Sequence, residues 1–353
     1  MMLKLIAFVC LFAGFKLLYN SYTKHEIIPA RPIDKAWWDS LSAEWKTILL
    51  INQNFCKQGT DINSIQNGYI NRMNSENEDD YSEENKSLHE LFEMKKFSLG
   101  YPDFYARALR YKFVVKNDSI DLATLGDLSM IYMVNGPGDL TPLERFPNLK
   151  VLILTDCGID NAIPIKSQLL DLEPLRYLKK LQVLHCSSDA LQSIEPIEDL
   201  VDLQELRLGN SSVTDLSPLK KLVNLTLLSV GPKVKSASVI GRLVGLKALY
   251  LDGCKTIPDL SKLEKLTKLS IEENEMAIID GSYRIKNIDF LKDLPNLEYL
   301  DLDNTSYKGN LELLDSFQHL KAITLPPVNT ETMLAFKKHH NNCVITNAFR
   351  YVR

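Results

Sequence analysis

LQELRLGNSSVTDLSPLKKLVN, residues 203–224, is followed at once by LTLLSVGPKVKSASVIGRLVG, residues 225–245, which has the same pattern. Each stretch has leucine at its first and fourth positions and an aliphatic residue at its sixth. Side chains alternate between the two faces of a β-strand, so these aliphatic residues share one face. The stretch therefore predicts a short strand with a leucine side that is buried and a second side that is left to residues such as Glu205 and Arg207.

The same pattern occurs nine times along the chain. The copies begin at Leu128, Leu149, Leu181, Leu203, Leu225, Leu246, Leu266, Leu297 and Leu320. The steps between them are 21, 32, 22, 22, 21, 20, 31 and 23 residues. A repeat of this period is typical of a solenoid, in which each coil buries its apolar side against the next coil.

The second half of several copies contains a proline after a polar residue. Examples are DLTPL at 139–143, DLEPL at 171–175, IEPI at 194–197 and DLSPL at 215–219. Proline loses no hydrogen bond at the first position of a helical turn, and a preceding Ser or Thr can cap that turn. We expect one 3₁₀ or α-helical turn in each coil, since little chain remains before the next strand.

These residues resemble the leucine-rich repeats, and within that family the 22-residue class of bacterial internalins and of a eukaryotic phosphatase-regulating subunit. The resemblance covers about residues 125–345. It implies an α/β solenoid: a leucine-rich repeat horseshoe with a parallel β-sheet on the concave face, short 3₁₀ or helical turns on the convex face and a helical N-terminal cap.

The family usually has asparagine three residues after the last strand leucine, where it bonds to neighbouring loops. In this chain that position holds Asp189, Ser211, Cys254 and Thr305, among others, and Lys233 in one copy. Cysteine, serine and threonine can substitute for asparagine here, whereas Lys233 and Val328 cannot do so well, which suggests a local irregularity at those two copies.

The sequence divides into four parts. Residues 1–24 are expected to be a signal peptide or an N-terminal membrane anchor, because Lys4 precedes an apolar run that is short for a membrane span. A mistaken start codon or an ordinary buried helix are the alternatives. Residues 25–124 form a helical cap region with an acidic loop at 74–86, residues 125–345 hold the repeats and a C-terminal cap, and residues 346–353 are a tail.

All three tryptophans lie in the cap region, where Trp38, Leu41, Trp45, Ile48 and Leu49 form one apolar stripe at helical spacing. We expect this stripe to pack on the first repeats, because a solenoid must cover its apolar ends. The alternative is a helix that binds a groove or a membrane surface. The C-terminal cap is expected in NTETMLAFKKHHNNCVITN, residues 329–347, as a helix followed by a final strand.

Two steps are longer than the others because of insertions at 158–170 and 275–286. Insertions in a solenoid leave the core as loops at one edge, and such loops often bind partners. Neutral drift in a tolerant loop is an equally good explanation.

Several classes of function are disfavoured by composition. The 41 Lys and Arg against 45 Asp and Glu provide no basic surface for nucleic acid. The six cysteines form no CxxC pair, and the catalytic and nucleotide-binding motifs GxSxG, HExxH, GxGxxG and the P-loop are absent from the sequence. Adjacent residues on a helix diverge by about 100°, so His339 and His340 are expected to face solvent without sharing an ion. We therefore expect no catalytic residues, no metal and no cofactor.

The side of the sheet that the leucines do not use is the candidate binding surface. Its predicted partner-binding residues are Tyr132, His185, Glu205, Arg207, Tyr250, Asp252, Glu272, Tyr299, Asp301 and Asp303. Tyrosine and arginine often contribute most of the binding energy of an interface. The acidic residues lie towards the C-terminal end of this face, so a protein partner with a basic patch would be attracted there.

The leading hypothesis is a non-enzymatic leucine-rich repeat protein that binds a protein partner and is exported or tethered to a membrane. A second hypothesis, from the phosphatase-regulator resemblance, is an intracellular regulatory subunit that holds an enzyme. A third is an enzyme with a site in residues 56–127. The sequence identifies neither the partner nor the oligomeric state.

Overall fold

The computed structural model describes residues 32–57, 121–134, 136–155, 170–254, 257–273, 285, 287–302, 305, 307, 311–325, 330–340 and 342–347. The chain divides into two compact units, Met1–Pro32 and Ile33–Arg353, and all that follows concerns the second. The predicted signal or anchor at 1–24, the acidic loop at 74–86 and nearly all of both insertions lie outside the described residues. Among the described helices, none combines the length and the apolar character that a membrane crossing requires.

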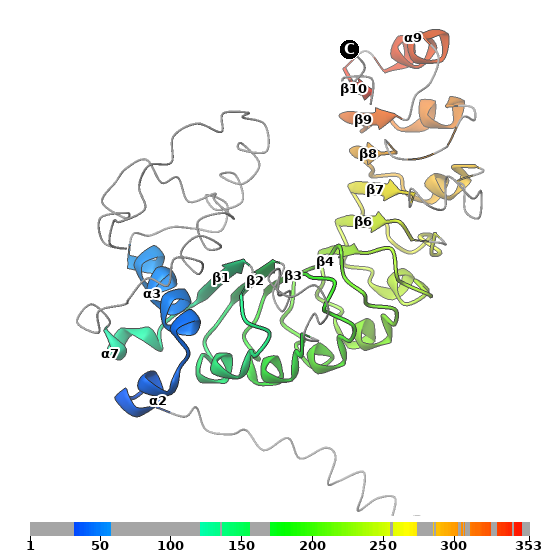
Figure 1. The fold of residues 1–353 in the computed structure, drawn as a ribbon. Helices are drawn as coiled ribbons and strands as arrows, with labels where there is room; N and C mark the ends of the chain where they lie inside the picture. Colours follow the sequence, from blue (N-terminus) through cyan, green and yellow to red (C-terminus); the bar gives the residue numbers. More distant parts are fainter. Residues whose placement is uncertain are drawn as a thin grey trace, which may run out of the picture. The chain divides into compact units, whose positions relative to one another are not determined.

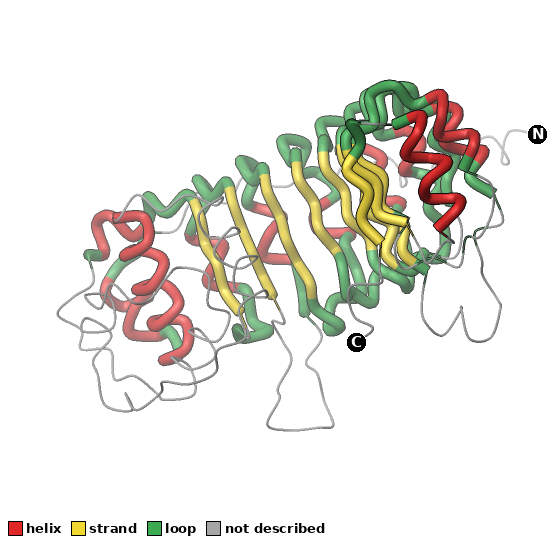
Figure 2. The backbone as a smooth tube through the Cα atoms, turned by 90° about the horizontal axis from the view of Figure 1, so that it is seen from above, coloured by secondary structure: helices red, strands yellow, loops and turns green. Residues whose placement is uncertain are grey.

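Ten parallel strands form one sheet in the order of the sequence, so every strand between β1 and β10 pairs with the strand before it and the strand after it in the chain (Figures 1 and 2). The strands are β1 (Met130–Val134), β2 (Val151–Thr155), β3 (Val183–Ser187), β4 (Glu205–Leu208), β5 (Leu227–Val230), β6 (Ala248–Asp252), β7 (Lys268–Glu272), β8 (Tyr299–Asp301), β9 (Ala322–Leu325) and β10 (Val344–Asn347).

Helical turns connect most of the strands on the other side of each coil (Figure 1). The 3₁₀ turns are η2 (Thr141–Arg145), η3 (Glu173–Tyr177), η4 (Glu195–Ile197), η5 (Ser217–Lys221), η6 (Ile240–Arg242), η7 (Asp289–Asp293) and η8 (Glu312–Ser316). The described α-helices are α2 (Lys35–Ser40), α3 (Ala43–Lys57), α7 (Leu122–Leu125) and α9 (Thr330–His339).

The strand register confirms the repeat alignment residue by residue. The middle aliphatic residue of each copy lies beside its counterparts on the neighbouring strands, in the row Ile131, Leu152, Leu184, Leu206, Leu228, Leu249, Leu269, Leu300 and Ile323. These side chains are at most 2% exposed. In β3 and β4 partly exposed and buried residues alternate, as expected for a strand with one side on a core. The predicted fold class, a leucine-rich repeat solenoid with a parallel sheet and 3₁₀ turns, is confirmed.

The proline turns form where they are predicted, but the capping group differs from the expected one. Pro142, Pro174, Pro196 and Pro218 lie in the first positions of η2 to η5. In the DLxP copies the turn is capped by the aspartate and not by the residue before proline: the Ser217 amide donates to Asp215 Oδ1 at 2.8 Å. The same bond recurs from Thr141 to Asp139 and from Glu173 to Asp171. An aspartate side chain readily accepts from a backbone N–H two residues on, which fixes the start of the turn.

The apolar stripe predicted for the N-terminal cap lies on two helices, α2 and α3. The break falls between α2 and α3, because Ser42 caps α3 by accepting from the Trp45 amide. Trp38 is 0% and Trp45 3% exposed, both within the main apolar core, and the Trp45 indole donates to the Asp139 carbonyl at 2.9 Å. The tryptophans therefore pack on the first repeats, as expected of a cap.

The edge of the first strand is closed by one side chain from α3. Asn52, fully buried, accepts from the Tyr132 amide at 2.8 Å and donates to the Tyr132 carbonyl at 3.0 Å. These are the two bonds that a preceding strand would make to β1. Since unpaired buried backbone groups are costly, Asn52 allows the sheet to end beneath a helix.

At the C-terminus, α9 and β10 form the predicted helix and final strand. The expectation for the two histidines is correct for His339, which is exposed and bonds Asp315 at 2.8 Å, and wrong for His340. His340 is 9% exposed and stacks on Phe336, with ring centroids 4.4 Å apart. His340 follows Phe336 by four residues, so both fall on the buried side of the chain, whereas Lys337, Lys338 and His339 between them are exposed.

The loop positions after the strands follow the family pattern only in part. Ser211 is buried, Cys254 Sγ lies 3.7 Å from the Gly231 carbonyl of the previous coil, and Thr305 donates to the Leu302 carbonyl. In the third copy, however, Asp189 is exposed and Ser188 is the buried residue, so the position is shifted by one. Lys233 is exposed, which agrees with the irregularity expected there.

Candidate interaction face

The outer sheet face is the side of the ten strands that points away from the leucine core. Its central row, read across the strands, is Tyr132, Ile153, His185, Arg207, Ser229, Tyr250, Ser270, Asp301 and Thr324. The structure thus brings into one line the residues that the repeat alignment placed there. A flanking row contains Glu205, Lys268 and Tyr299, and Asp252 lies beside Glu272 in the row on the other side.

The N-terminal end of the outer sheet face is buried. Met130, Tyr132 and Ile153 are 6, 8 and 5% exposed. A partner could reach little of the Tyr132 side chain, although the sequence places it among the binding candidates. The accessible part of the face therefore begins at β3 and continues to β10, where Val344 is 60% exposed.

Three candidate residues on β3 and β4 share one bonded network. Glu205 Oε1 lies 2.7 Å from His185 Nε2 and accepts from Arg207 Nε at 2.8 Å. The Arg207 guanidinium lies over the Tyr250 ring, 5.5 Å from its centroid. The side chains of His185, Glu205 and Arg207 are 12, 23 and 35% exposed. This network fixes the orientation of an arginine and a tyrosine on a surface that is still open to a partner.

The charge state of Glu205 follows from these contacts. Burial alone would raise its pKa, but the hydrogen bonds and charges of His185 and Arg207 outweigh burial and lower the pKa of Glu205 to about 2. The carboxylate is therefore ionised throughout the physiological range and keeps both partners in place.

Asp252 on β6 has the opposite electrostatic environment. Its carboxylate approaches Ser229 Oγ at 3.4 Å and leans across Gly209, where a Cβ atom would lie 3.6 Å from Asp252 Oδ2. Burial, followed by repulsion from Glu272, raises the pKa of Asp252 to about 6, although the Ser229 bond and the Arg207 charge act in the other direction. Asp301 adds a smaller repulsion. Together, Asp252, Glu272 and Asp301 form an acidic group on β6 to β8, called here the acidic trio.

One cation lies beside the acidic trio. Lys268 on β7 places its ammonium 5.0 Å from the centroid of the Tyr299 ring on β8. Tyr299 is 38% exposed, so an aromatic ring as well as a charge is offered to solvent here. Asp303, the last of the predicted acidic candidates, lies outside the described residues.

One surface feature was not predicted from the sequence. Val201, Val223 and Val244 are 47, 58 and 51% exposed and stand at the same position of three consecutive coils. The signal was available in the L-V-x-L that precedes β4, β5 and β6. Surface valines are common singly, and three in register form a small apolar stripe.

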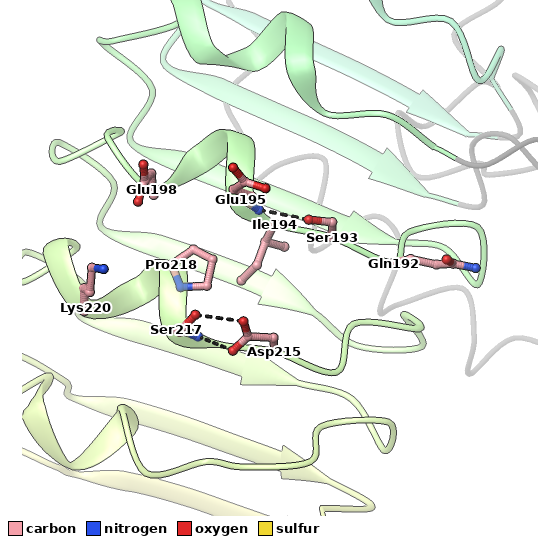
Figure 3. Close-up of a pocket in the computed structure, with 9 residues that line it drawn as sticks. All are labelled: Gln192, Ser193, Ile194, Glu195, Glu198, Asp215, Ser217, Pro218 and Lys220. Atoms are coloured by element: carbon pink, nitrogen blue, oxygen red, sulfur yellow. Dashed lines mark hydrogen bonds between the residues drawn. The ribbon is translucent and has the colours of Figure 1, made fainter. Parts of the chain in front are cut away.

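A shallow pocket lies between η4 and η5, away from the outer sheet face (Figure 3). Glu195, Glu198, Asp215 and Lys220 are among the residues that line it. Asp215 accepts from both the amide and the hydroxyl of Ser217, and the Glu195 amide donates to Ser193 (Figure 3). Much of the polar lining is therefore engaged in shaping the two turns.

The described residues contain no group of three or more His, Cys, Asp or Glu side chains that could hold a metal ion. Cys186, Cys254 and Cys343 are buried free thiols, and burial raises the pKa of Cys254 to about 12. A thiol that stays protonated at neutral pH is a poor nucleophile.

The coils, their register and their turns define the class: a solenoid of strand and turn with a single parallel sheet. Sequence comparison gives the family, since the profile described as leucine-rich repeat region matches residues 128–336, more than half of the chain. The chain belongs to the leucine-rich repeat family. Proteins of this family are typically binding scaffolds, which supports a role in protein interaction.

Several solved structures are similar in fold. An internalin (InlF) from Listeria monocytogenes is 24% identical, with 64% of this chain and 71% of that chain covered and a TM-score of 0.46. A leucine-rich repeat protein of Leptospira interrogans is 18% identical, with coverage of 64% and 67% and a TM-score of 0.42. The plant peptide hormone receptor RGFR1, in complex with RGF2, is 20% identical, with coverage of 57% and 34% and a TM-score of 0.40. None of the curated proteins matches the sequence.

Proposed function

We propose that this chain is a non-enzymatic interaction protein that binds a protein partner through the outer sheet face between β3 and β8. The observation that carries the proposal is the network in which Glu205 holds His185 and Arg207, with Arg207 over Tyr250. Ordering long side chains on binding costs free energy, and this network has ordered them before a partner arrives. An arginine and a tyrosine held in this way have the character of binding hot spots.

The partner is proposed to be basic where it meets β6 to β8. The acidic trio gives this part of the face a negative potential, against which Lys268 is the one cation in the same strands of the described sheet face. Complementary charge increases the rate of encounter and selects between partners more than it adds affinity. The trio therefore favours partners with lysine or arginine at this position.

We also propose, from the sequence alone, that residues 1–24 export the chain or tether it to a membrane. Fractionation of cells that produce the full chain with a C-terminal tag is the test. Recovery with membranes or outside the cytoplasm supports the proposal. A wholly cytoplasmic pool contradicts it and favours the intracellular regulatory subunit instead.

The binding proposal is tested by cross-linking the full chain to its neighbours in the producing cells and comparing variants. Tyr250→Ala and Arg207→Ala are expected to reduce the cross-linked partner strongly without lowering the melting temperature by more than a few degrees. Arg242→Gln is the control, because Arg242 is exposed in η6 on the turn side of a coil. Unchanged cross-linking in both face variants, or its loss in the control, contradicts the proposal.

A further inference from the structure

Arg207 is held by only one edge of its guanidinium. Nε donates to Glu205, and the group stacks on Tyr250. Within the described part of the chain, Nη1 and Nη2 have no hydrogen-bond partner, and the side chain is 35% exposed. A guanidinium whose plane is fixed and whose two terminal nitrogens are open matches the two oxygens of a carboxylate.

The carboxylate of Asp252, on β6, does not occupy this position. Asp252 makes no ion pair with Arg207 among the described residues, although the Arg207 charge lowers its pKa. Its carboxylate is directed to Ser229 Oγ instead. The open edge of Arg207 is therefore available to a carboxylate from outside the chain.

The side chains of the acidic trio lie two to four strands away from Arg207 in the sheet. Along the central row, Arg207 on β4 is followed by Ser229, Tyr250, Ser270 and Asp301 on the next four strands. Neighbouring strands are about 4.8 Å apart, so Glu272 on β7 is about 14 Å from Arg207 across the sheet. An extended peptide covers that distance in about four residues.

The residues between the two charged positions leave room for a peptide backbone. Ser229 and Ser270 have short side chains on either side of Tyr250, and both are 7% exposed, beneath the level of their neighbours. Tyr250 between them offers a partly exposed ring against which a partner residue can pack.

We propose that the outer sheet face binds an extended segment of a protein partner that carries two opposite charges. An aspartate or glutamate of the segment pairs with Nη1 and Nη2 of Arg207, and a lysine or arginine about four residues away lies on the acidic trio. The segment crosses the strands between these two points. This inference rests on the proposed function and specifies the chemistry of its partner.

The test is selection of displayed random decapeptides on the full chain and on four variants, each first shown to melt as the wild type does. Arg207→Gln removes the charge that would bind the acidic residue of the peptide. Arg207→Lys keeps that charge and the pair with Glu205 but loses the two terminal nitrogens of the guanidinium. A Glu272→Gln, Asp301→Asn double variant removes two of the carboxylates that would bind the basic residue of the peptide. Arg242→Gln makes the same change as the first variant on the turn side of the solenoid.

The wild type and Arg242→Gln are expected to select peptides with an acidic residue three to five positions from a basic one. Arg207→Gln should keep the basic preference and lose the acidic one, and the double variant should do the reverse. For a peptide selected on the wild type, Arg207→Gln and Arg207→Lys should each raise Kd by about tenfold, the value of one charge-assisted bidentate bond.

Two outcomes overturn the inference in different ways. Selection of purely basic peptides by the wild type, or an acidic preference that survives in Arg207→Gln, refutes the two-charge segment while leaving the face as a binding surface. Peptides that bind all variants equally, or no enrichment at all, refute the proposed function as well.

Discussion

Glu205 and Asp252 lie two strands apart on one sheet face, and their surroundings lower the pKa of Glu205 to about 2 and raise the pKa of Asp252 to about 6. Both are partly buried, so desolvation raises the pKa of each. The difference comes from the residues nearby: two cationic side chains bond Glu205, whereas the acidic groups of Glu272 and Asp301 surround Asp252. The character of this face is therefore set by side-chain pairs and not by its total charge.

At the residue scale, Asp252→Asn is expected to stabilise the protein at neutral pH. The folded pKa of about 6 exceeds the ordinary value of 3.8, so ionising Asp252 opposes folding. The penalty is absent below pH 4, grows between pH 4 and 6, and is complete above pH 6. This rise in pKa corresponds to about 3 kcal/mol of unfolding free energy, and solvent screening reduces the expected effect to about 1–2 kcal/mol.

Urea unfolding at pH 7.5 and pH 4 measures this effect. Asp252→Asn should be more stable than the wild type at pH 7.5 and equal to it at pH 4. Asp202→Asn is the control, since Asp202 is exposed in the loop after η4, and it should change stability by less than about 0.5 kcal/mol. A less stable Asp252→Asn at pH 7.5 would refute the burial argument.

Glu205→Gln is expected to act in the opposite direction. The pKa of Glu205 is lowered from 4.5 to about 2, so its stabilising contribution is present above pH 4.5 and is lost as the pH falls through 2. Because the group is partly exposed, we expect a loss of about 1 kcal/mol at pH 7, shrinking at pH 3. Urea unfolding at both pH values checks it, with exposed Glu264→Gln as the matched control. An equal loss at pH 7 and pH 3 would exclude an electrostatic origin.

At the scale of the element, the first strand depends on one side chain of α3. Asn52→Ala removes both bonds to the Tyr132 backbone and leaves a buried N–H and C=O unsatisfied. The expected cost is about 2–6 kcal/mol, from about 1–3 kcal/mol for each of the two orphaned groups. Hydrogen exchange of the Tyr132 amide should accelerate in step with this loss. Asn224→Ala, which removes an exposed bond to the Val201 carbonyl, should cost under about 1 kcal/mol. Slow exchange at Tyr132 in Asn52→Ala would show that another group closes the edge.

The elements predicted best from the sequence are those whose determining residues are close in the chain and recur in every coil. The strand register was predictable because every coil must bury the same leucine against the next, as Leu206 does between Leu184 and Leu228. The break between α2 and α3 was harder, since the apolar spacing runs on from Trp38 to Leu49 and only the Ser42 hydroxyl, which caps the start of α3, marks the break. The His185 to Glu205 pair joins residues 20 apart, and only the register and the rotamers together bring them to 2.7 Å.

At the scale of the whole molecule, function and stability are assigned to opposite sides of each coil. The leucine side varies little from β1 to β10, because one missing contact would weaken two neighbouring coils. The outer side changes from buried apolar residues at β1 and β2 to the Glu205 network and then to the acidic trio. A partner therefore meets a different chemistry at each position along the sheet, on a backbone that is nearly the same throughout.

This architecture predicts that truncating a buried side chain loosens different strands according to its position along the solenoid. Leu228 on β5 is 0% exposed and lies between Leu206 and Leu249, so Leu228→Ala should cost about 2–5 kcal/mol and speed hydrogen exchange in coils on both sides. Phe336 on α9 is 3% exposed and packs on His340 at the C-terminal end. Phe336→Ala should also cost about 3–5 kcal/mol locally but release β9 and β10 first, because each coil contacts only its neighbours.

Hydrogen exchange read strand by strand distinguishes the two variants. In Phe336→Ala the amides of β3 to β5 should keep their wild-type protection, whereas Leu228→Ala should lower it there. Exposed Leu334→Ala, also on α9 and 57% exposed, is the matched control and should leave both ends unchanged. Equal loss of protection over all ten strands in Phe336→Ala would mean that the sheet opens as one unit and that its coils do not act as nearest neighbours.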